Sequence, residues 1–179
     1  MGKVINSTFV SLDGVINHME RWHFDYIDEE TDRITLEQLQ ACTSMLMGRK
    51  TYEVYASVWP ERDGQYPDEI NRKRKHVVSS TLEWAGWANT TVLRGDLVTE
   101  VAELKQQPGD ILMHGFGPVA HTLMANGQLD ELHLWVHPQF AGLGGPDDTL
   151  LRPGPNTKLE LTRAHRLGSG VVLLSYQVG

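Results

Sequence analysis

Hydrophobic and polar positions follow two alternating periods along the chain, and these periods predict strands and helices in turn. Short apolar runs that end at glycine or polar turn residues predict buried strands. Longer segments with apolar residues at helical spacing, such as Ile34, Leu39 and Cys42, predict helices. The predicted strands cover residues 4–10, 44–47, 76–79, 90–93, 110–114, 131–137, 157–167 and 171–178. The predicted helices cover residues 30–42, a segment that opens at 49, and residues 68–73, 96–107 and 118–125.

This order of elements predicts the fold class. Strands that alternate with helices favour a mostly parallel sheet with both faces covered. The last two strands are joined by Gly168-Ser169-Gly170, a hairpin signal that adds antiparallel pairing at one edge. We therefore expect a three-layer α/β/α sandwich with a mixed, mostly parallel sheet and a C-terminal antiparallel hairpin. No linker interrupts the pattern, so residues 1–179 are interpreted as one domain.

Two long connections stand out between the predicted elements. Residues 14–30 are polar and aromatic and form a predicted loop over a site, whereas residues 139–156 are rich in glycine and proline. Asp96 is expected to cap the helix predicted at 96–107, because its carboxylate can accept hydrogen bonds from the free amides at the helix start.

Composition narrows the class of protein. Apolar residues make up 40% of the chain and charged residues 22%, which is typical of a folded domain. The formal net charge of -7 argues against a nucleic-acid partner, which would need a basic face. Cys42 is the single cysteine, which excludes an intrachain disulfide and the paired cysteines of a zinc deaminase. With no signal-peptide pattern and no apolar stretch of membrane-spanning length, we expect a cytoplasmic protein without a membrane partner.

Two segments share a design that suits phosphate binding: a buried strand, then glycine, then a helix. They are residues 45–51, with Gly48, Arg49, Lys50 and Thr51, and residues 111–118, with Gly115, Phe116 and Gly117. The first amides of a helix have no partner within it and bind anions together with the helix dipole. Two such junctions at one end of a parallel sheet can hold one dinucleotide. Glycines at ordinary strand-to-helix turns are the alternative interpretation.

Ser79 and Ser80 follow the next predicted strand, and Arg94 ends the strand after it. Hydroxyls and a guanidinium at these strand ends can bind a ribose 2′-phosphate. The alternatives are a simple turn for the serines and a solvent-facing side chain for Arg94.

A family resemblance rests on these motifs in order. Residues 47–53 resemble the Gly-Arg-x-Thr segment of dihydrofolate reductases, residues 78–80 their following Leu-Ser-Ser strand end, and residues 115–117 their Gly-Gly phosphate loop. Residues 11–14, 130–138 and 142–145 are similar to the C-terminal reductase domain of the bacterial riboflavin biosynthesis deaminase-reductase. The chain thus resembles a stand-alone member of the dihydrofolate reductase-like superfamily.

That resemblance implies the fold, NADPH as cofactor and a homodimer. By matching position, Gly48, Arg49 and Thr51 would bind the cofactor, Ser79 and Ser80 would lie near the 2′-phosphate, and Gly115 and Gly117 would hold the pyrophosphate.

Candidate substrate-side residues come from the turn after the first strand, from the early loop and from the helix that follows the first junction. Asp13 is the candidate catalytic residue, as a proton relay or a hydrogen-bond acceptor, with a turn residue as the alternative. Trp22 and Phe24 are candidate substrate-binding residues that could form a wall for a flat heterocycle, with local packing as the alternative. Tyr52 and Tyr55 could line the pocket or pack in the core. Asp25 and Asp28 are further candidate proton donors unless they are simply solvated.

No metal site is expected, although the chain has eight histidines. His133 and His137 lie four apart on a predicted strand, which separates them by roughly 13 Å. His18 and His23 lie in a loop with no evident third ligand. The same predicted strand, residues 131–137, also carries apolar residues that suit either a dimer interface or the core: Leu132, Trp135 and Val136.

The sequence therefore predicts an NADPH-dependent reductase that transfers hydride to a small heterocyclic, pterin-like or aminopyrimidine-like, or carbonyl substrate. The alternative is a nucleotide-binding module of the same fold without turnover, because no acidic residue aligns with the one that dihydrofolate reductases carry on their first helix. A purely structural dimer subunit is the third hypothesis.

Overall fold

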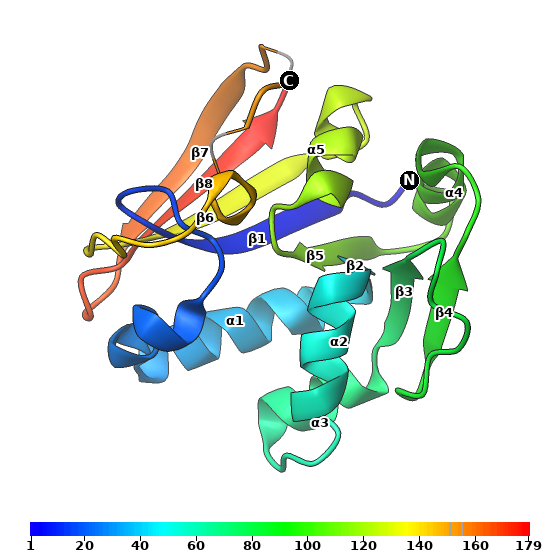
Figure 1. The fold of residues 1–179 in the computed structure, drawn as a ribbon, viewed down its shortest axis with the longest axis horizontal. Coiled ribbons are helices and arrows are strands. Elements are labelled where there is room, and N and C mark those ends of the chain that lie inside the picture. Colours follow the sequence, from blue (N-terminus) through cyan, green and yellow to red (C-terminus); the bar gives the residue numbers. More distant parts are fainter. Residues whose placement is uncertain (151, 155) are drawn as a thin grey trace.

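The computed structural model describes residues 1–150, 152–154 and 156–179, and its centre is one eight-stranded sheet (Figure 1). The strands are β1 (Val4–Ser11), β2 (Cys42–Gly48), β3 (Arg74–Val78), β4 (Thr90–Leu93), β5 (Asp110–His114), β6 (Glu131–His137), β7 (Leu159–Arg166) and β8 (Val172–Val178). The α-helices are α1 (Glu29–Ala41), α2 (Arg49–Val58), α3 (Gln65–Arg72), α4 (Leu97–Lys105) and α5 (Pro118–Ala125).

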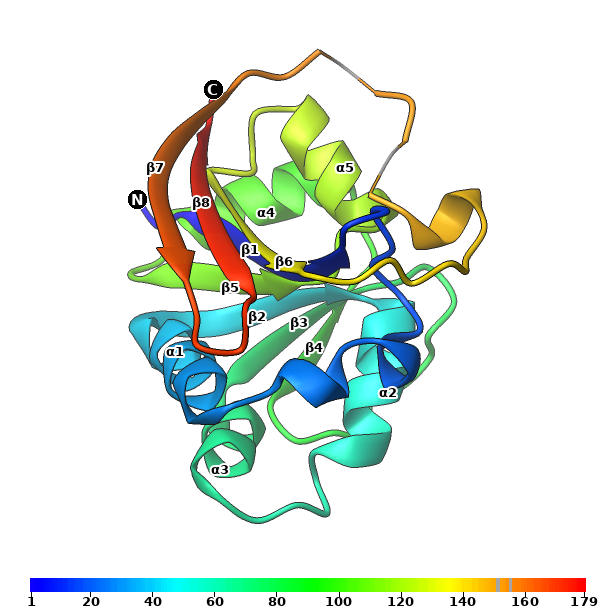
Figure 2. The same ribbon diagram turned by 90° about the vertical axis from the view of Figure 1, so that its left-hand side faces the viewer.

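The strand order is β4-β3-β2-β5-β1-β6-β8-β7. Every pair from β4 to β6 is parallel, and the β6–β8 and β7–β8 pairs are antiparallel. Helices α1, α2 and α3 cover one face of the sheet and α4 and α5 the other, as right-handed crossovers require (Figure 1). The C-terminal hairpin forms one edge (Figure 2). The predicted fold class is confirmed.

Alternate residues of the central strands build two cores. Met45 and Met47 of β2 pack with Leu112 of β5 on the face of α1 to α3. Leu46 and Met113 lie in the cluster on the opposite face, with residues of α4 and α5. Both faces are buried, which explains why these strands are continuous apolar runs in the sequence.

Helix starts follow the predicted capping chemistry at two places. Asp96 caps α4, because its side chain accepts a hydrogen bond of 2.9 Å from the amide of Thr99. Asp28 caps α1 in the same way, with 2.8 Å to the amide of Thr31, and that bond lowers the pKa of the Asp28 carboxyl. The carboxylate of Asp28 is therefore engaged at a helix start.

The largest departure from the predicted elements is α3, which begins at Gln65 instead of near Asp68. Pro67 lies in its first turn, where the missing amide hydrogen costs no helix bond. At the other end of α3, the fully buried Lys75 donates hydrogen bonds to the carbonyls of Ile70, Asn71 and Lys73. This side chain fixes the helix end to β3, which starts at Arg74, two residues earlier than predicted.

The two long connections contain short 3-10 helices. Residues 14–28 include η1 (Met19–Arg21) and η2 (Phe24–Tyr26), and the later connection includes η3 (Pro146–Asp148). Residues 151 and 155 of the predicted loop at 139–156 lie outside the described residues. Within the described part of the chain, none of the helices combines the length and the apolar character needed to traverse a lipid bilayer.

Candidate functional site

The two glycine junctions meet at the carboxyl edge of the sheet. Strands β2 and β5 are neighbours, so their ends at Gly48 and His114 lie side by side. A Cβ atom added to Gly115 would lie 3.3 Å from the hydroxyl oxygen of Thr51. A Cβ added to Gly48 would lie 3.4 Å from Val119 of α5. The structure therefore brings the predicted junction residues into one place.

The helices that start at these junctions leave their first amides open. Among the described residues, neither Gly48 before α2 nor Gly117 before α5 has a side-chain cap hydrogen bond. By contrast, the starts of α1 and α4 are occupied by the carboxylates of Asp28 and Asp96. The positive ends of α2 and α5 are thus available to an external anion.

A buried polar pair holds the second junction in shape. The Asn6 side chain is fully buried and donates a hydrogen bond of 2.8 Å from Nδ2 to the carbonyl of Gly115. Its Oδ1 accepts a hydrogen bond of 2.7 Å from the hydroxyl of Thr8. Gly115 has a φ of +79°, a region that favours glycine. Sequence reasoning missed this pair, although polar residues at alternate positions between Val4 and Val10 were the available signal.

Arg49 reaches the loop that follows β3. Its Nη1 donates to the hydroxyl of Thr81 at 2.5 Å, and its Nε lies 2.6 Å from Glu53. Ser79 is buried and its hydroxyl accepts hydrogen bonds from the amides of Thr81 and Leu82, so it shapes the turn. Arg49 therefore lies beside the strand-end hydroxyl groups.

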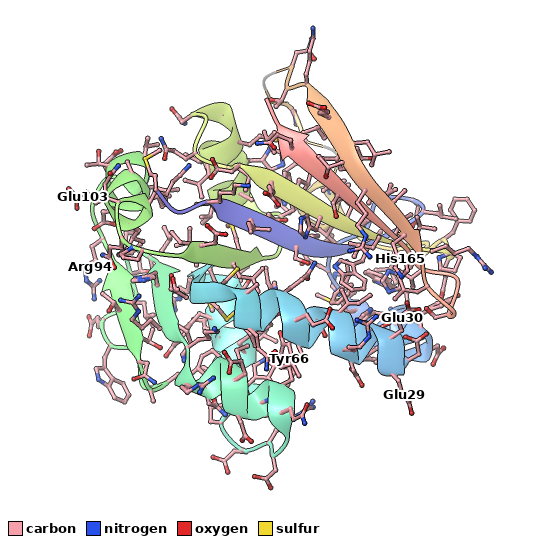
Figure 3. The ribbon with its side chains drawn as sticks, turned by 180° about the vertical axis from the view of Figure 1, so that it is seen from behind. Glu29, Glu30, Tyr66, Arg94, Glu103 and His165 are labelled. Atoms are coloured by element: carbon pink, nitrogen blue, oxygen red, sulfur yellow. The ribbon has the colours of Figure 1, made fainter. Side chains whose placement is uncertain are left out.

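The sequence predicts that three further residues bind the cofactor near its phosphates: Lys50, Ser80 and Arg94. Lys50 and Ser80 are exposed. Arg94 lies at the β4 edge of the sheet (Figure 3), where its Nη2 donates to the carbonyls of Leu82 and Glu83 at 2.5 and 3.0 Å. Arg94 thus fixes the loop after β3 through its backbone, a role that neither sequence interpretation included.

Phe116 is buried within the core on the α5 side, where it packs against His121 with ring centroids 4.9 Å apart. Its neighbour Gly117 has open space where a Cβ would project. The backbone of residues 115–117, more than the Phe116 side chain, is therefore the part of this loop that a ligand can approach.

Asp13 is engaged in loop architecture. Its carboxylate accepts hydrogen bonds from the hydroxyl of Ser11 and from the amides of Ala141 and Gly142, at 2.5, 2.9 and 2.8 Å. The Ser11 bond, followed by the two amide bonds, lowers the pKa of Asp13 to about 2. All three hydrogen bonds tie the carboxylate to the surrounding loops, so the turn-residue interpretation suits this structure better.

The predicted aromatic wall does not form as a unit. Trp22 is buried, and its indole nitrogen donates to the carbonyl of Asn17 at 2.9 Å. Tyr52 is also buried, in the core under α2, and its hydroxyl accepts from the amide of Trp87 at 3.3 Å. Phe24 is 60% exposed. Trp22 and Tyr52 therefore follow the packing alternative.

Two histidines far apart in the sequence form a buried pair. His23 Nδ1 lies 2.9 Å from His137 Nε2, and His137 Nδ1 lies 2.9 Å from the carbonyl of Trp135. Burial, together with the neighbouring His137, lowers the pKa of His23 to about 4. The described residues contain no group of three or more histidine, cysteine or acidic side chains that could hold a metal ion.

Leu132, Trp135 and Val136 are accounted for by the core. Leu132 and Trp135 are buried, and Val136 packs against the cluster that contains Leu132. The homodimer stays a prediction, and the core alternative suits the two buried side chains, Leu132 and Trp135.

A second pair, which sequence reasoning did not identify, adjoins the glycine junction. His114 ends β5 directly before Gly115, and its Nδ1 lies 2.9 Å from the hydroxyl of Tyr55 on α2. Burial lowers the pKa of His114 to about 4 and raises the pKa of Tyr55. The signal available in the sequence was a histidine at the last position of an otherwise apolar strand.

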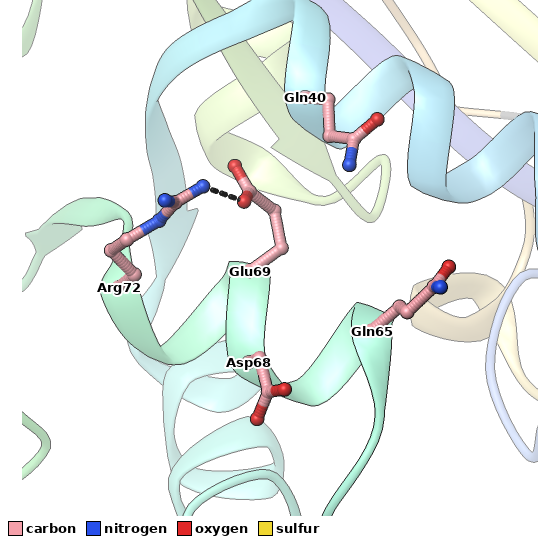
Figure 4. Close-up of a pocket in the computed structure, with 5 residues that line it drawn as sticks. All are labelled: Gln40, Gln65, Asp68, Glu69 and Arg72. Carbon is pink, nitrogen blue, oxygen red and sulfur yellow. Dashed lines mark hydrogen bonds and ion pairs between the residues drawn. The ribbon is translucent and has the colours of Figure 1, made fainter.

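A separate surface pocket lies between α1 and α3 and is lined by Gln40, Gln65, Asp68, Glu69 and Arg72 (Figure 4). The carboxylate of Glu69 is paired with Arg72 and, at 2.7 Å, with Lys73. The Glu69 carboxylate is thus already engaged by two cations, of which Arg72 is mostly exposed.

Comparison with known proteins gives a consistent set of relatives. The family model described as the RibD C-terminal domain matches residues 2–173. The chain is 27% identical to the uncharacterized protein YyaP of Bacillus subtilis over 181 residues, which cover 97% of this chain and 94% of that protein.

Two solved structures have the same fold. One is a candidate riboflavin biosynthesis protein from a Shewanella species, with a TM-score of 0.79, 18% identity, and coverage of 100% of this chain and 99% of that one. The other is dihydrofolate reductase from Enterococcus faecalis in complex with NADP(H), with a TM-score of 0.64, 14% identity, and coverage of 99% and 97%.

Proposed function

The chain belongs to the RibD C-terminal domain family, and from this premise we propose that it is an NADPH-dependent reductase. Family and fold make it a reductase-type domain, in agreement with the predicted resemblance. The cofactor transfers hydride to a small heterocyclic or carbonyl substrate, and the protein supplies binding and orientation.

The observation that carries this proposal is the meeting of two open helix starts at neighbouring strand ends. The amides that begin α2 and α5 bind the pyrophosphate from two sides, because Gly48 and Gly115 let the ligand approach the backbone. Arg49 and the loop after Ser79 bind the 2′-phosphate, which distinguishes NADPH from NADH. Thr51 lies within reach of both junctions and orients the same phosphates.

The test is a titration of the wild-type protein and the Arg49→Ala variant with NADPH and NADH, followed by nicotinamide fluorescence. Arg49→Ala removes a charge-assisted hydrogen bond to the 2′-phosphate at a half-exposed site. This loss should weaken NADPH binding by about tenfold or more. NADH binding should change little, since NADH lacks the 2′-phosphate. Arg33→Ala is the matched control, because Arg33 is also an exposed arginine paired with a glutamate four residues later, Glu37, but lies on α1 away from the junctions. Equal losses for both cofactors in Arg49→Ala would contradict the assignment of Arg49.

A nucleotide-binding module without turnover is the second candidate. It is favoured by Asp13, whose carboxylate is ionised and bound to the backbone of residues 141 and 142. The two candidates separate when NADPH-loaded protein is screened against pterins, pyrimidines and small carbonyl compounds. Substrate-dependent oxidation of NADPH identifies the reductase, and tight NADPH binding without any oxidation across the screen identifies the module.

A further inference from the structure

A row of polar side chains crosses three neighbouring strands of the sheet. Ser7 of β1 pairs in register with His114 of β5 on one side and with His133 of β6 on the other. Residues in register across a sheet point to the same face, here the face of α1 and α2. Ser7 is buried and the two histidines are half-buried, so the donors and acceptors of this row need hydrogen-bond partners.

Most of this row is satisfied within the protein. The hydroxyl of Ser7 donates to Gln38 Oε1 at 2.9 Å and accepts from the indole nitrogen of Trp135 at 2.9 Å. Gln38 Nε2 lies 3.0 Å from His133 Nδ1, and His133 Nε2 lies 3.3 Å from Glu131. The polar side chains around Ser7 and His133 are therefore engaged with one another.

His114 is the exception. Its Nδ1 is bound to the Tyr55 hydroxyl. Its Nε2 has no hydrogen-bond partner among the described residues, and it is not one of the unpartnered polar atoms that are shut off from solvent. Either group can donate in this bond, depending on the tautomer of His114; we assign the Tyr55 hydroxyl as the donor, because its proton has no other acceptor among the described residues. That bond places the imidazole proton on Nε2, and the raised pKa of Tyr55 keeps its hydroxyl protonated as a donor.

The surroundings of His114 are aromatic, and the guanidinium of Arg62 lies over the Trp59 ring at 5.4 Å from its centroid. The Tyr55 and His114 rings lie 5.9 Å apart, and Trp59 lies 6.1 Å from Tyr55 and 5.0 Å from Tyr66. All four side chains are partly exposed, and Tyr66 on α3 is labelled in Figure 3. Burial alone lowers the pKa of His114, without a contribution from any carboxylate of the described residues. We call Tyr55, Trp59, Tyr66 and His114 the aromatic cluster.

We propose that His114 donates a hydrogen bond from Nε2 to the substrate, that Tyr55 is the positioning residue that fixes its tautomer, and that the aromatic cluster selects a flat, uncharged heterocycle. This inference rests on the proposed function, because His114 adjoins Gly115 of the cofactor junction. Aromatic faces attract cations, but Arg62 already occupies the Trp59 face, and its charge together with the donor N–H of His114 disfavours a cationic ring. A neutral ring carbonyl or ring nitrogen accepts from Nε2 and stacks on the aromatic side chains.

The test uses two small probes at pH 6: uracil, which is flat and neutral, and 2,4-diaminopyrimidine, which is protonated. Binding to the NADPH-loaded wild-type protein is measured by NMR titration, with the imidazole nitrogen signals of His114 followed in the same samples. We expect uracil to bind about tenfold more tightly than the diaminopyrimidinium ion and to shift the Nε2 signal. Preference for the cation, or the absence of uracil binding, overturns the proposal.

Variants separate hydrogen bonding from packing. His114→Phe should weaken uracil binding about tenfold, while His114→Gln, which retains an amide donor near the position of Nε2, should restore most of it. Tyr55→Phe keeps the ring packing but removes the hydroxyl, so it should weaken uracil binding and redistribute the His114 tautomers in the nitrogen spectrum. His76→Phe is the matched control, because Nδ1 of His76 has no partner to lose. Unchanged uracil binding in His114→Phe overturns the assignment.

The same samples report on the cofactor. NADPH binding that is intact in every variant, with uracil binding lost in His114→Phe, is the expected result. Intact NADPH binding with no dependence of uracil binding on His114 rejects this inference and leaves the proposed function standing. Failure of the wild-type protein to bind NADPH rejects the proposed function itself.

Discussion

Replacement of Asn6 by leucine tests the part of the site that is furthest from the sequence motifs. Asn6 is fully buried, and its side chain links the carbonyl of Gly115 to the hydroxyl of Thr8. Asn6→Leu conserves the approximate volume of the side chain but removes both hydrogen bonds. The Gly115 carbonyl and the buried Thr8 hydroxyl then lose their partner.

The expected cost follows from the two groups left without a partner. Each unsatisfied buried polar group costs about 1–3 kcal/mol, and the added apolar surface of leucine offsets part of the sum. We expect the free energy of unfolding to fall by about 2–4 kcal/mol. Because the lost bond holds the loop at Gly115, NADPH binding should weaken as well, even though Asn6 lies beneath the loop.

The assay is denaturant unfolding of the wild-type, Asn6→Leu, Thr8→Val and double variants, combined with NADPH titration. Thr8→Val alone removes one hydrogen bond and should cost about 1 kcal/mol. In the double variant the two losses should be less than additive, since the two side chains share a bond. A loss below about 1 kcal/mol in Asn6→Leu, or unchanged NADPH binding in a folded Asn6→Leu protein, would refute the reasoning.

Three further predictions concern separate parts of the site. Burial lowers the pKa of His23 from 6.5 to about 4, so between these pH values the unfolded chain binds a proton that the folded chain excludes. The free energy of unfolding should therefore fall as the pH drops through this window. In thermal melts recorded at several pH values, His23→Phe should make this fall smaller. The amides of residues 141 and 142 bind different oxygens of the Asp13 carboxylate, and asparagine has only one side-chain oxygen. Asp13→Asn should therefore increase the rate of limited proteolysis at residues 141–142 over that of the wild type; an unchanged cleavage pattern would contradict the loop role. Gly115→Ala and Gly127→Ala both place alanine at positive φ and should each cost about 1 kcal/mol, but NADPH titration should show weaker binding only for Gly115→Ala.

Local signals explain what the sequence predicted well. The strand–glycine–helix pattern at Gly48 and Gly115 placed both junctions, and Asp96 marked a helix start, because each signal depends on a few consecutive residues. The central strands were found for the same reason, since burial on both faces makes them continuous apolar runs.

The contacts that the sequence did not predict join residues far apart in the chain. His23 and His137 are 114 residues apart, Asn6 and Gly115 are 109 apart, and Asp13 and Ala141 are 128 apart. No local pattern encodes such pairs, because the sheet order that brings β1 between β5 and β6 is a property of the whole fold. Asp13 illustrates the consequence: its position after β1 suggested chemistry, and its partners across the fold give it a structural task.

The central claim is that one nucleotide binds at the open starts of α2 and α5. The most direct measurement is a map of backbone amide NMR shifts as NADPH is added to the wild-type protein. The account predicts the largest shifts at residues 48–51 and 115–119, with smaller shifts at the Asp-capped starts of α1 and α4. Largest shifts around the pocket between α1 and α3, or no shifts at saturating NADPH, would contradict it.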